Sequence, residues 1–224
     1  MKTQISSKKS ILITGGGGDW AQRFANEFSD AFDITLVSRQ QLDVTQDSEV
    51  ASYFEGKAFD VVINNAGCIH PNRLLESDSG EWIQDISVNL IGTYLVSKYA
   101  LKNNHNTLII NISSTAGFNA YKDWSSYCSS KAGAAMLTKC AHLENSGCGI
   151  RVMGLSPGTV ATQMQRDIKR SGINPVSQLD WEKHIPADWP AKALLWMCTS
   201  AANDWCGEEI SLRDQAIRDR LGLS

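Results

Sequence analysis

A phenol, an ammonium group and a hydroxyl occur in this sequence at a spacing that could support proton transfer. Tyr127 and Lys131 are four residues apart in SSYCSSKAG, so a helix would place both side chains on one face. Ser114 ends the apolar run NTLIINISS, thirteen residues before Tyr127, and residues at the carboxyl ends of parallel strands face a ligand crevice. The three groups can therefore meet. The charge of Lys131 would then lower the pKa of the Tyr127 phenol toward the range in which an acid–base group works.

A glycine-rich stretch near the start of the chain could bind the phosphates of a dinucleotide. Residues 14–21 read TGGGGDWA, follow an apolar run and precede a segment of helical period. Gly16, Gly18 and Ala21 fit the G-x-G-x-x-G/A fingerprint, whose last position only needs a small residue. Asp19 is then free to act as the N-cap of the following helix, although its charge would repel a pyrophosphate to some extent.

The end of the second apolar run, ITLVSRQ, bears on the choice of dinucleotide. In such folds an acidic residue here binds the ribose 2′-hydroxyl of NAD, whereas an arginine accommodates the 2′-phosphate of NADP. Ser38 carries no charge and Arg39 follows it. The pattern favours NADP(H) over NAD(H), and an ordinary solvated arginine is the alternative.

The elements that must position these residues alternate along the chain in a βαβ pattern. Short apolar, β-branched runs predict six strands, and the segments of helical period between them predict helices on both faces of the sheet. We expect an α/β fold, a Rossmann-like doubly wound parallel sheet, as one domain over residues 1–224. Residues 161–186 are irregular and form a candidate substrate loop. The expected strands are residues 11–14, 34–37, 60–63, 108–112, 150–155 and 209–212, and the expected helices are residues 20–28, 46–54, 79–102, 125–143 and 187–198.

Composition limits the kinds of partner that the protein can have. The chain has 224 residues, a formal net charge of −3 and no basic block, so we expect no nucleic acid as a partner. No stretch approaches the ~20 apolar residues of a membrane span, and the first residues lack the apolar core of a signal peptide. The six cysteines have no C-x-x-C spacing and are expected to be reduced. We expect a soluble, cytoplasmic protein with a small-molecule substrate, no membrane contact and no metal ion.

Several motifs, in one order along the chain, carry a family resemblance. Between about Ile11 and Thr162 the sequence resembles the short-chain dehydrogenase/reductase family, of the short single-domain type. Each motif is weak alone, but the whole set in the correct order and spacing is specific. The motifs are TGGGGDWA, NNAG at residues 64–67, Asn89 in SVNLIGTYLVSK, NISS ending at Ser114, YCSSK with Tyr127 and Lys131, and SPGTVAT at residues 156–162.

The resemblance implies an NAD(P)-dependent oxidoreductase that interconverts a carbonyl and a secondary alcohol by hydride transfer. Tyr127 would be the acid or base at the substrate oxygen, and Ser114 would hydrogen-bond the same oxygen. Lys131 would also hold the nicotinamide ribose, and Asn89 would hold a water that links Lys131 to solvent. The resemblance places Asp43 and Val44 beside the adenine, Asn65, Ala66 and Gly67 beside the adenosine ribose, and Val160 and Thr162 at the nicotinamide amide. The other expected cofactor contacts are Gly15, Gly18, Asp19 and Trp20 in the glycine-rich stretch, together with Arg39 and Lys131.

The sequence departs from the family pattern in two places. Only residues 39–42 separate Ser38 from Asp43, where the family usually has another helix and strand. We therefore expect one βα unit to be missing and the adenosine site to be more open. The chain also ends without the usual Asp-Gly-Gly, and a charged amphipathic tail follows the last strand. The resemblance implies a homodimer or homotetramer, but a solvated terminal helix explains the tail equally well.

Two other functions stay open at this point. One is a dinucleotide-binding sensor or scaffold without turnover, and the other is an epimerase or dehydratase that keeps its cofactor bound. The complete set of catalytic positions favours the oxidoreductase. Trp124, Trp181 and Trp189 belong to segments that should border the pocket, where they would suit an apolar or ring-shaped substrate. Core packing explains these tryptophans equally well.

Overall fold

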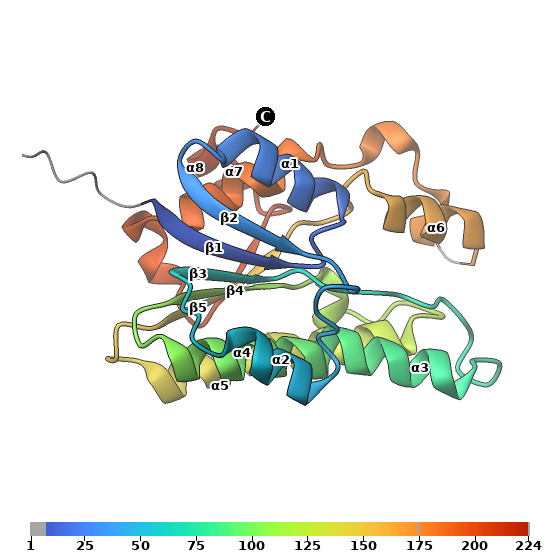
Figure 1. Cartoon of the computed structure of the whole chain (residues 1–224). Helices are drawn as coiled ribbons and strands as arrows, with labels where there is room; N and C mark the ends of the chain where they lie inside the picture. Colours follow the sequence, from blue (N-terminus) through green and yellow to red (C-terminus); the bar gives the residue numbers. More distant parts are fainter. Residues whose placement is uncertain (1–7, 174, 224) are drawn as a thin grey trace, which may run out of the picture.

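Six parallel strands form the centre of the molecule, which the computed structural model describes over residues 8–173 and 175–223 (Figure 1). The strands are β1 (Lys9–Thr14), β2 (Phe32–Val37), β3 (Val61–Asn64), β4 (Leu108–Ile112), β5 (Arg151–Ser156) and β6 (Glu209–Ser211). In space they follow the order β2-β1-β3-β4-β5-β6, and every neighbouring pair is parallel. The predicted six-stranded, doubly wound fold is confirmed.

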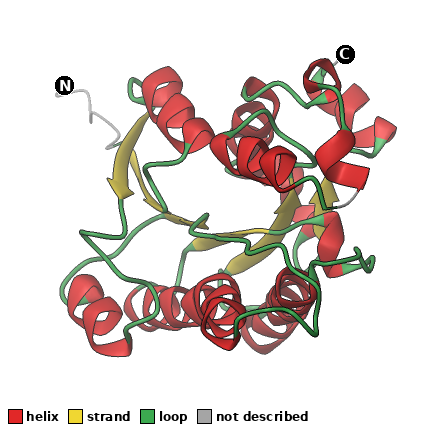
Figure 2. Cartoon of the chain, turned by 90° about the vertical axis from the view of Figure 1, so that its right-hand side faces the viewer, coloured by secondary structure: helices red, strands yellow, loops and turns green. Residues whose placement is uncertain are grey.

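Helices cover both faces of this sheet. The long ones are α1 (Asp19–Phe28), α2 (Asp47–Phe54), α3 (Ser79–Ile86), α4 (Thr93–Asn103), α5 (Ser125–Asn145), α6 (Gln163–Ser171) and α7 (Asp188–Met197), and a shorter one, α8 (Gln215–Leu221), follows β6. Figures 1 and 2 show α1, α7 and α8 on one face and α2, α4 and α5 on the other. None of the helices in the described ranges is both long enough and apolar enough to cross a bilayer.

The two faces of the sheet bury separate sets of apolar side chains. Along β1, Ile11 and Ile13 pack with residues of α1 and α7, whereas Leu12 packs with residues of α2 and α4. All three side chains have an exposed fraction of 0%. Strands buried on both faces are nearly continuous apolar runs, which explains why the sequence located them well.

The helix predicted over residues 79–102 is interrupted by a change of helix type. A π-helical segment, η1 (Ser87–Gly92), joins α3 to α4 and contains Asn89. Such segments are rare and often occur at functional sites. The apolar periodicity continues through it, so the sequence pattern did not reveal the interruption.

The segment over residues 161–186 is more regular than expected. It contains α6 and two 3₁₀ turns, Pro175–Gln178 and Trp181–Lys183. The prediction of an irregular loop is therefore wrong in part. Ile168 is the buried side chain between residues 163 and 170, and a single apolar anchor gives almost no periodic signal.

The order of the strands places a crevice beside β1. The chain runs from β1 outward to β2 and then returns to β3 on the other side of β1, so the winding direction reverses there. Ligands in open α/β sheets bind at the carboxyl ends of the strands at such a reversal. β2 is one of the two edge strands, with β6 at the other edge, and it is followed at once by the loop to α2, as expected for a chain that lacks one βα unit.

The charged tail after the last strand forms α8. Asp214 caps its N-terminus by accepting a hydrogen bond from Ala216 N at 2.9 Å. Ile217 is buried against the cluster that includes α1 and α7. Part of this helix therefore belongs to the core.

Candidate active site

The loop between β1 and α1 requires glycine at two positions. Gly15 has a φ of +63°, and a Cβ atom there would lie 2.8 Å from Ala66 Cα. A Cβ atom at Gly16 would lie 2.7 Å from the Cβ of Leu36 on β2. At Gly17 a Cβ atom would meet nothing within 4 Å. The loop thus packs closely against Ala66 and Leu36 at Gly15 and Gly16, whereas Gly17 faces open space.

The N-terminus of α1 continues this loop without a side-chain cap. Gly18 is the N-cap residue in an extended conformation, and it has no side chain to accept a hydrogen bond from the first turn. Free N–H groups at a helix N-terminus bind anions. Ala21 is fully buried, which explains the need for a small residue there. This geometry fits a pyrophosphate.

The expectation that Asp19 caps α1 is wrong. Asp19 is the first residue of the helix, and its Oδ2 accepts a hydrogen bond from the backbone N–H of Gln163 at 2.9 Å. Gln163 begins α6. The carboxylate therefore ties the glycine loop to the segment that was expected to cover the substrate.

The loop after β3 is fixed against the glycine loop by hydrogen bonds. Asn65 Nδ2 donates to the carbonyl oxygens of Thr14 at 3.0 Å and Gly15 at 2.9 Å. The Thr14 hydroxyl accepts from the N–H groups of Asn65 at 3.1 Å and Ala66 at 3.2 Å. The Asn65 side chain therefore sets the separation of the two loops.

Ser114, Tyr127 and Lys131 meet in the wall of one cleft with the glycine loop. Ser114 follows β4, and the other two lie one turn apart on α5. Lys131 Nζ lies 5.7 Å from the centre of the Tyr127 ring and donates a hydrogen bond to the Ile112 carbonyl at 2.8 Å. The structure brings together the three side chains that the spacing selected.

Burial shifts the pKa values of the two titrating groups in opposite directions. Loss of hydration raises the pKa of Tyr127 to about 12, and the Ser114 hydroxyl acts against this rise. Loss of hydration lowers the pKa of Lys131 to about 8, against the effects of Cys68 and Glu209. Burial outweighs the help from Ser114, and the fall in the Tyr127 pKa that was expected from Lys131 is not found.

Asn89 does not line the cleft, and its side chain joins two elements by hydrogen bonds. Its Oδ1 accepts from Cys68 N at 2.9 Å, and its Nδ2 donates to Cys68 O at 2.8 Å and to Ser130 Oγ at 3.1 Å. Its carbonyl oxygen accepts from Thr93 Oγ1 at 2.9 Å. The side chain joins the loop after β3 to α5, and the water-holding role stays a prediction.

The cleft has a volume of about 350 Å³, within the usual range for small-ligand sites. One end is polar and includes the glycine loop, and the other is largely apolar. The predicted cofactor contacts in its wall are Gly15, Gly18, Asp19, Trp20, Asn65, Gly67, Lys131, Val160 and Thr162. The apolar part contains Tyr121, Trp124, Met164, Ile168 and Val176.

Trp124 is the one of the three candidate tryptophans that borders this cleft. Its ring lies 5.2 Å from the Tyr121 ring and 5.8 Å from the Tyr127 ring, centre to centre. Trp181 instead pairs with His184 at 4.7 Å. Trp189 packs against the core of the sheet. The sequence could not separate these positions, because all three occur in segments of mixed polarity.

Of the residues predicted on the adenosine side, Asn65 and Gly67 line the cleft, whereas Arg39, Asp43, Val44 and Ala66 are outside its described wall. The exposed Arg39 side chain forms an ion pair with Asp43 at 3.4 Å. Asp43 also accepts from the N–H and hydroxyl of Thr45 at 3.0 and 2.7 Å, and it does not cap α2. Val44 is buried against Gly92. Contact of these residues and Ala66 with an adenosine stays a prediction.

Two carboxyl groups with buried oxygen atoms were missed by the sequence reasoning. Asp85 is fully buried and accepts from His70 Nδ1 at 2.7 Å and Ser126 Oγ at 2.6 Å, beside Tyr127. Glu209 on β6 has a buried Oε2 atom. Asp85 lies between apolar residues in WIQDISV, which was the available signal, whereas Glu209 follows Gly207 and Glu208 and has no such signal.

Comparison with known proteins decides the family. A profile of the family described as short chain dehydrogenase matches residues 9–172. The chain belongs to this family. The resemblance noted in the sequence is confirmed.

This chain covers different shares of the relatives that it matches. The 3-oxoacyl-[acyl-carrier-protein] reductase of Aquifex aeolicus is 26% identical over 92% of this chain and 86% of its own length. Trans-4-hydroxycyclohexanecarboxylate dehydrogenase of Sinomonas cyclohexanicum is 32% identical over 71% of this chain and 64% of its own length. Benzil reductase of Bacillus cereus is 32% identical over 53% of this chain, which spans 51% of that relative. The chain thus spans about half to two-thirds of the length of several relatives that it matches.

Solved structures agree with the fold. The structure described as ElxO with NADP bound has a TM-score of 0.78 and 26% identity, covering 92% of this chain and 97% of that one. The ligand-free aldohexose dehydrogenase of Thermoplasma acidophilum has a TM-score of 0.79 and 22% identity, covering 92% of each chain. The likeness extends over nearly the whole sheet and its helices.

The tie between Asp19 and Gln163 predicts how α6 responds to substitution. Asp19→Ala removes the acceptor, so the amides of residues 163–166 should exchange hydrogen about fivefold faster, for a hydrogen bond worth about 1 kcal/mol. Hydrogen-exchange mass spectrometry of the cofactor-free protein measures this. Asp19→Asn keeps an acceptor oxygen and is the matched control. Equal exchange in Asp19→Ala and the natural protein would contradict the tie.

The lowered pKa of Lys131 predicts a cost in stability. A lysine whose pKa falls on folding, from 10.5 to about 8, destabilises the protein fully below pH 8, and the cost disappears as the pH rises toward 10.5. At pH 7, Lys131→Met should therefore raise the free energy of unfolding by about 1–3 kcal/mol, after the loss of the bond to Ile112.

Urea unfolding at pH 7 and pH 10 measures this gain, which should be smaller at pH 10. Lys139→Met on the same helix, with a half-exposed side chain, is the control and should change stability by less than about 0.5 kcal/mol. If Lys131→Met is less stable than the natural protein at pH 7, burial of the Lys131 charge does not cost the protein stability.

Proposed function

We propose that this chain is an NAD(P)-dependent oxidoreductase that interconverts a carbonyl and a secondary alcohol by hydride transfer. The observation that carries the proposal is the placement of Ser114, Tyr127 and Lys131 in one cleft with an uncapped helix N-terminus and its glycine loop. The names of its relatives, which include reductases and dehydrogenases, support the same reaction class.

The donor set of the cleft fits a nicotinamide dinucleotide. Gly15 and Gly18 would face the pyrophosphate, Lys131 the nicotinamide ribose, and Val160 and Thr162 the nicotinamide amide. When bound, the dinucleotide supplies the hydride, and its oxidised ring carries a positive charge. Such a charge favours ionisation of the buried phenol that burial alone opposes.

The residues of this chain would handle the proton. Ser114 positions the substrate oxygen by a hydrogen bond, and Tyr127 donates its phenolic proton to that oxygen during reduction. Lys131 returns a proton to the phenolate, and in oxidation each transfer runs in reverse. Tyr127 and Lys131 are buried, which limits the access of bulk water to this exchange.

Arg39 is proposed as the partner of a 2′-phosphate, which makes NADP(H) the preferred cofactor. The side chain is free to move, because 72% of it is exposed and its ion pair with Asp43 is on the surface. Related structures are described with NADH and with NADPH, so the family accommodates both.

The proposed substrate is a small carbonyl or alcohol with an apolar, ring-shaped part. The support is the aromatic and aliphatic wall around Trp124 next to Tyr127. The chain as a single domain, with α6 covering the substrate, is part of the same proposal.

A homodimer or homotetramer is the proposed assembly, in the cytoplasm. Apolar side chains are exposed on the outer surface of the α3–α4 region and α5, namely Ile83, Ile91, Tyr94 and Met136, and burial between copies would remove them from water. All six cysteines are free thiols, as is usual in a reducing compartment.

Loss of the phenolic hydroxyl tests the reaction. Tyr127→Phe should bind NADPH within about threefold of the natural affinity and lose at least about 100-fold in kcat on a panel of aromatic ketones. Calorimetry and the absorbance of NADPH measure the two quantities. Tyr53→Phe, on α2, is the control. Tight NADPH binding without turnover by the natural protein would favour a sensor or scaffold, and cofactor retained through purification would favour an epimerase or dehydratase.

Removal of the Arg39 charge tests the cofactor preference. Arg39→Ala should weaken NADPH binding about tenfold or more, since it removes a charge-assisted contact, and leave NADH binding unchanged. Arg23→Ala on α1 is the control for a general loss of positive charge. Parallel weakening of both dinucleotides would argue against a 2′-phosphate contact.

A further inference from the structure

Three neighbouring strands carry polar atoms that are buried without a hydrogen-bond partner on the side of α5. They are the hydroxyl oxygens of Ser113, directly after β4, and Ser156, at the end of β5, together with Oε2 of Glu209 on β6. The exposed fractions of the two serines are 5% and 0%. Nearly all buried polar groups in proteins are hydrogen-bonded, so such a set requires an explanation.

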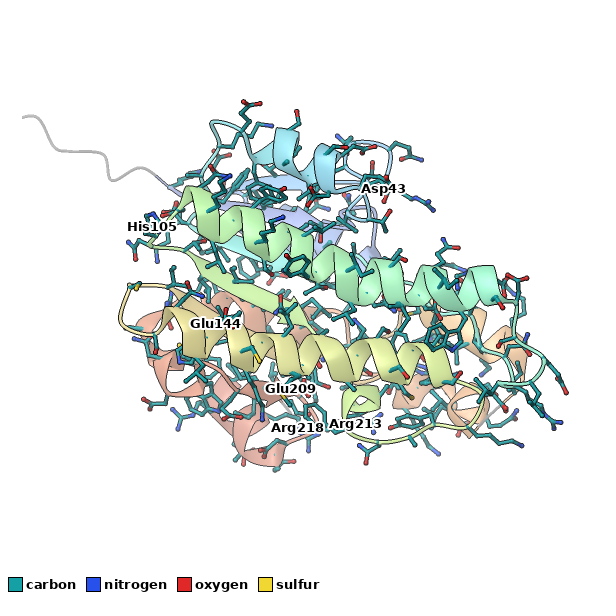
Figure 3. All side chains as sticks on the ribbon, turned by 90° about the horizontal axis from the view of Figure 1, so that it is seen from below. Asp43, His105, Glu144, Glu209, Arg213 and Arg218 are labelled. Carbon is teal, nitrogen blue, oxygen red and sulfur yellow. The ribbon has the colours of Figure 1, made fainter. Side chains whose placement is uncertain are left out.

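The strand register places this set on the α5 face of the sheet. Val152 of β5 packs in the cluster on that face, and side chains alternate along a strand, so Gly154 and Ser156 face the same way. Gly154 pairs with Glu209 on the next strand. Ser113 is two residues after Asn111 and so faces the same way, and Asn111 donates a hydrogen bond to Thr138 of α5. Figure 3 shows Glu209 beside α5 in the view from below.

Gly154 leaves the space between Glu209 and β4 without an intervening side chain. In register, Asn111 of β4, Gly154 of β5 and Glu209 of β6 form one row. A Cβ atom at Gly154 would lie 3.6 Å from the Cβ of Glu209. The Glu209 carboxyl can therefore approach the region of Ser113 across β5.

This set lies next to Lys131, whose Nζ donates a hydrogen bond at 2.8 Å to the carbonyl of Ile112, the residue before Ser113. Burial raises the pKa of Glu209 to about 7, while the Ser113 hydroxyl, Lys131 and Lys139 act against the rise. Glu209 in turn opposes the fall of the Lys131 pKa. The Ser113 hydroxyl is near enough to favour the Glu209 carboxylate, yet Ser113 Oγ and Glu209 Oε2 form no hydrogen bond of normal geometry within the described residues. A water between polar groups at this separation would satisfy them.

We propose that Glu209 is a positioning residue that keeps Lys131 protonated, exchanging a proton with it through water held by Ser113 and Ser156. The inference rests on the proposed function. After Tyr127 gives its proton to the substrate oxygen, the Lys131 ammonium gives one to the phenolate. The Glu209 carboxylic acid gives one to the Lys131 amine, and the partly exposed Glu209 carboxylate regains one from solvent. Each transfer breaks one O–H or N–H bond and forms another, and no electrons move.

Charged groups near this path come from several elements. Glu209 faces Lys131 and Lys139 of α5, and Lys139 also pairs with the exposed Glu208 at 3.8 Å. Lys131 is further influenced by Cys68, from the loop after β3. Of these, Glu208 offers a matched control, because Glu208→Gln removes one negative charge from the adjacent position outside the buried set.

The test compares Glu209→Gln with Glu208→Gln in the cofactor-free protein. The pKa of Lys131 is followed by carbon-13 NMR of protein labelled at lysine, with Lys131→Met to assign the signal. Glu209→Gln should lower that pKa by about one unit, and Glu208→Gln should leave it unchanged. An unchanged Lys131 pKa in Glu209→Gln overturns the inference, whether or not the protein has turnover.

Kinetics add a readout that a merely structural role would not move. In ketone reduction, the alkaline limb of kcat against pH should move about one unit lower in Glu209→Gln, and Glu209→Asp should restore part of the shift. An unmoved limb overturns the inference. If the natural protein reduces no carbonyl, the proposed function fails, and the NMR result still decides the charge linkage.

A second variant covers the case in which Glu209→Gln does not fold. Ser113→Ala removes the hydroxyl that stabilises the Glu209 carboxylate, so it should raise the Glu209 pKa above about 7 in protein labelled at glutamate. An unchanged value would overturn the link between Ser113 and Glu209.

Discussion

Lys131 carries a positive charge into a place where 6% of its side chain remains exposed, and much of the surrounding structure offsets the lost hydration. The Ile112 carbonyl, at the end of β4, accepts one of its hydrogens. Gly117 allows the turn after β4 to pack on the α5 backbone, because a Cβ atom there would lie 2.9 Å from Lys131 O. Close packing brings the strand end and the helix together, and this also brings Ser114 to Tyr127.

The polar networks beside this charge fix the loops around it. Asn89 joins the loop after β3 to α5, and Asp85 holds His70 and Ser126 next to Tyr127. Buried networks with every member satisfied are rigid. The polar atoms under α5 are different, since they lack direct partners and can exchange protons through water. Lys131 therefore has rigid hydrogen-bond networks on one side, around Asn89 and Asp85, and on the other side the Glu209 carboxyl, whose pKa of about 7 is near neutral pH.

The sequence predicted most of the fold and the centre of the site, for physical reasons that apply to particular residues. β1, β3 and β4 are buried on both faces and read as apolar runs, while Tyr127 and Lys131 share a helix face by spacing alone. The π-helical turn at Asn89 was not predicted, because it leaves the apolar periodicity intact. The helix α6 was not predicted, because Ile168 alone gives almost no periodic signal. The roles of Asp19 and Glu209 depend on residues far along the chain, such as Gln163 and Ser113, which no local pattern brings together.

The position of β2 at the edge of the sheet has a consequence for how such proteins diverge. An edge strand has one neighbour, so a βα unit can be lost beyond it while the interior strands keep their packing and register. The loop after β2 is where Arg39 and Asp43 lie, whereas Ser114 and Tyr127 depend on β4 and α5 in the middle of the sheet. Insertions, deletions or charge changes in this loop can therefore alter which dinucleotide is bound without disturbing proton transfer at Tyr127. Cofactor preference and proton transfer are thus free to evolve separately.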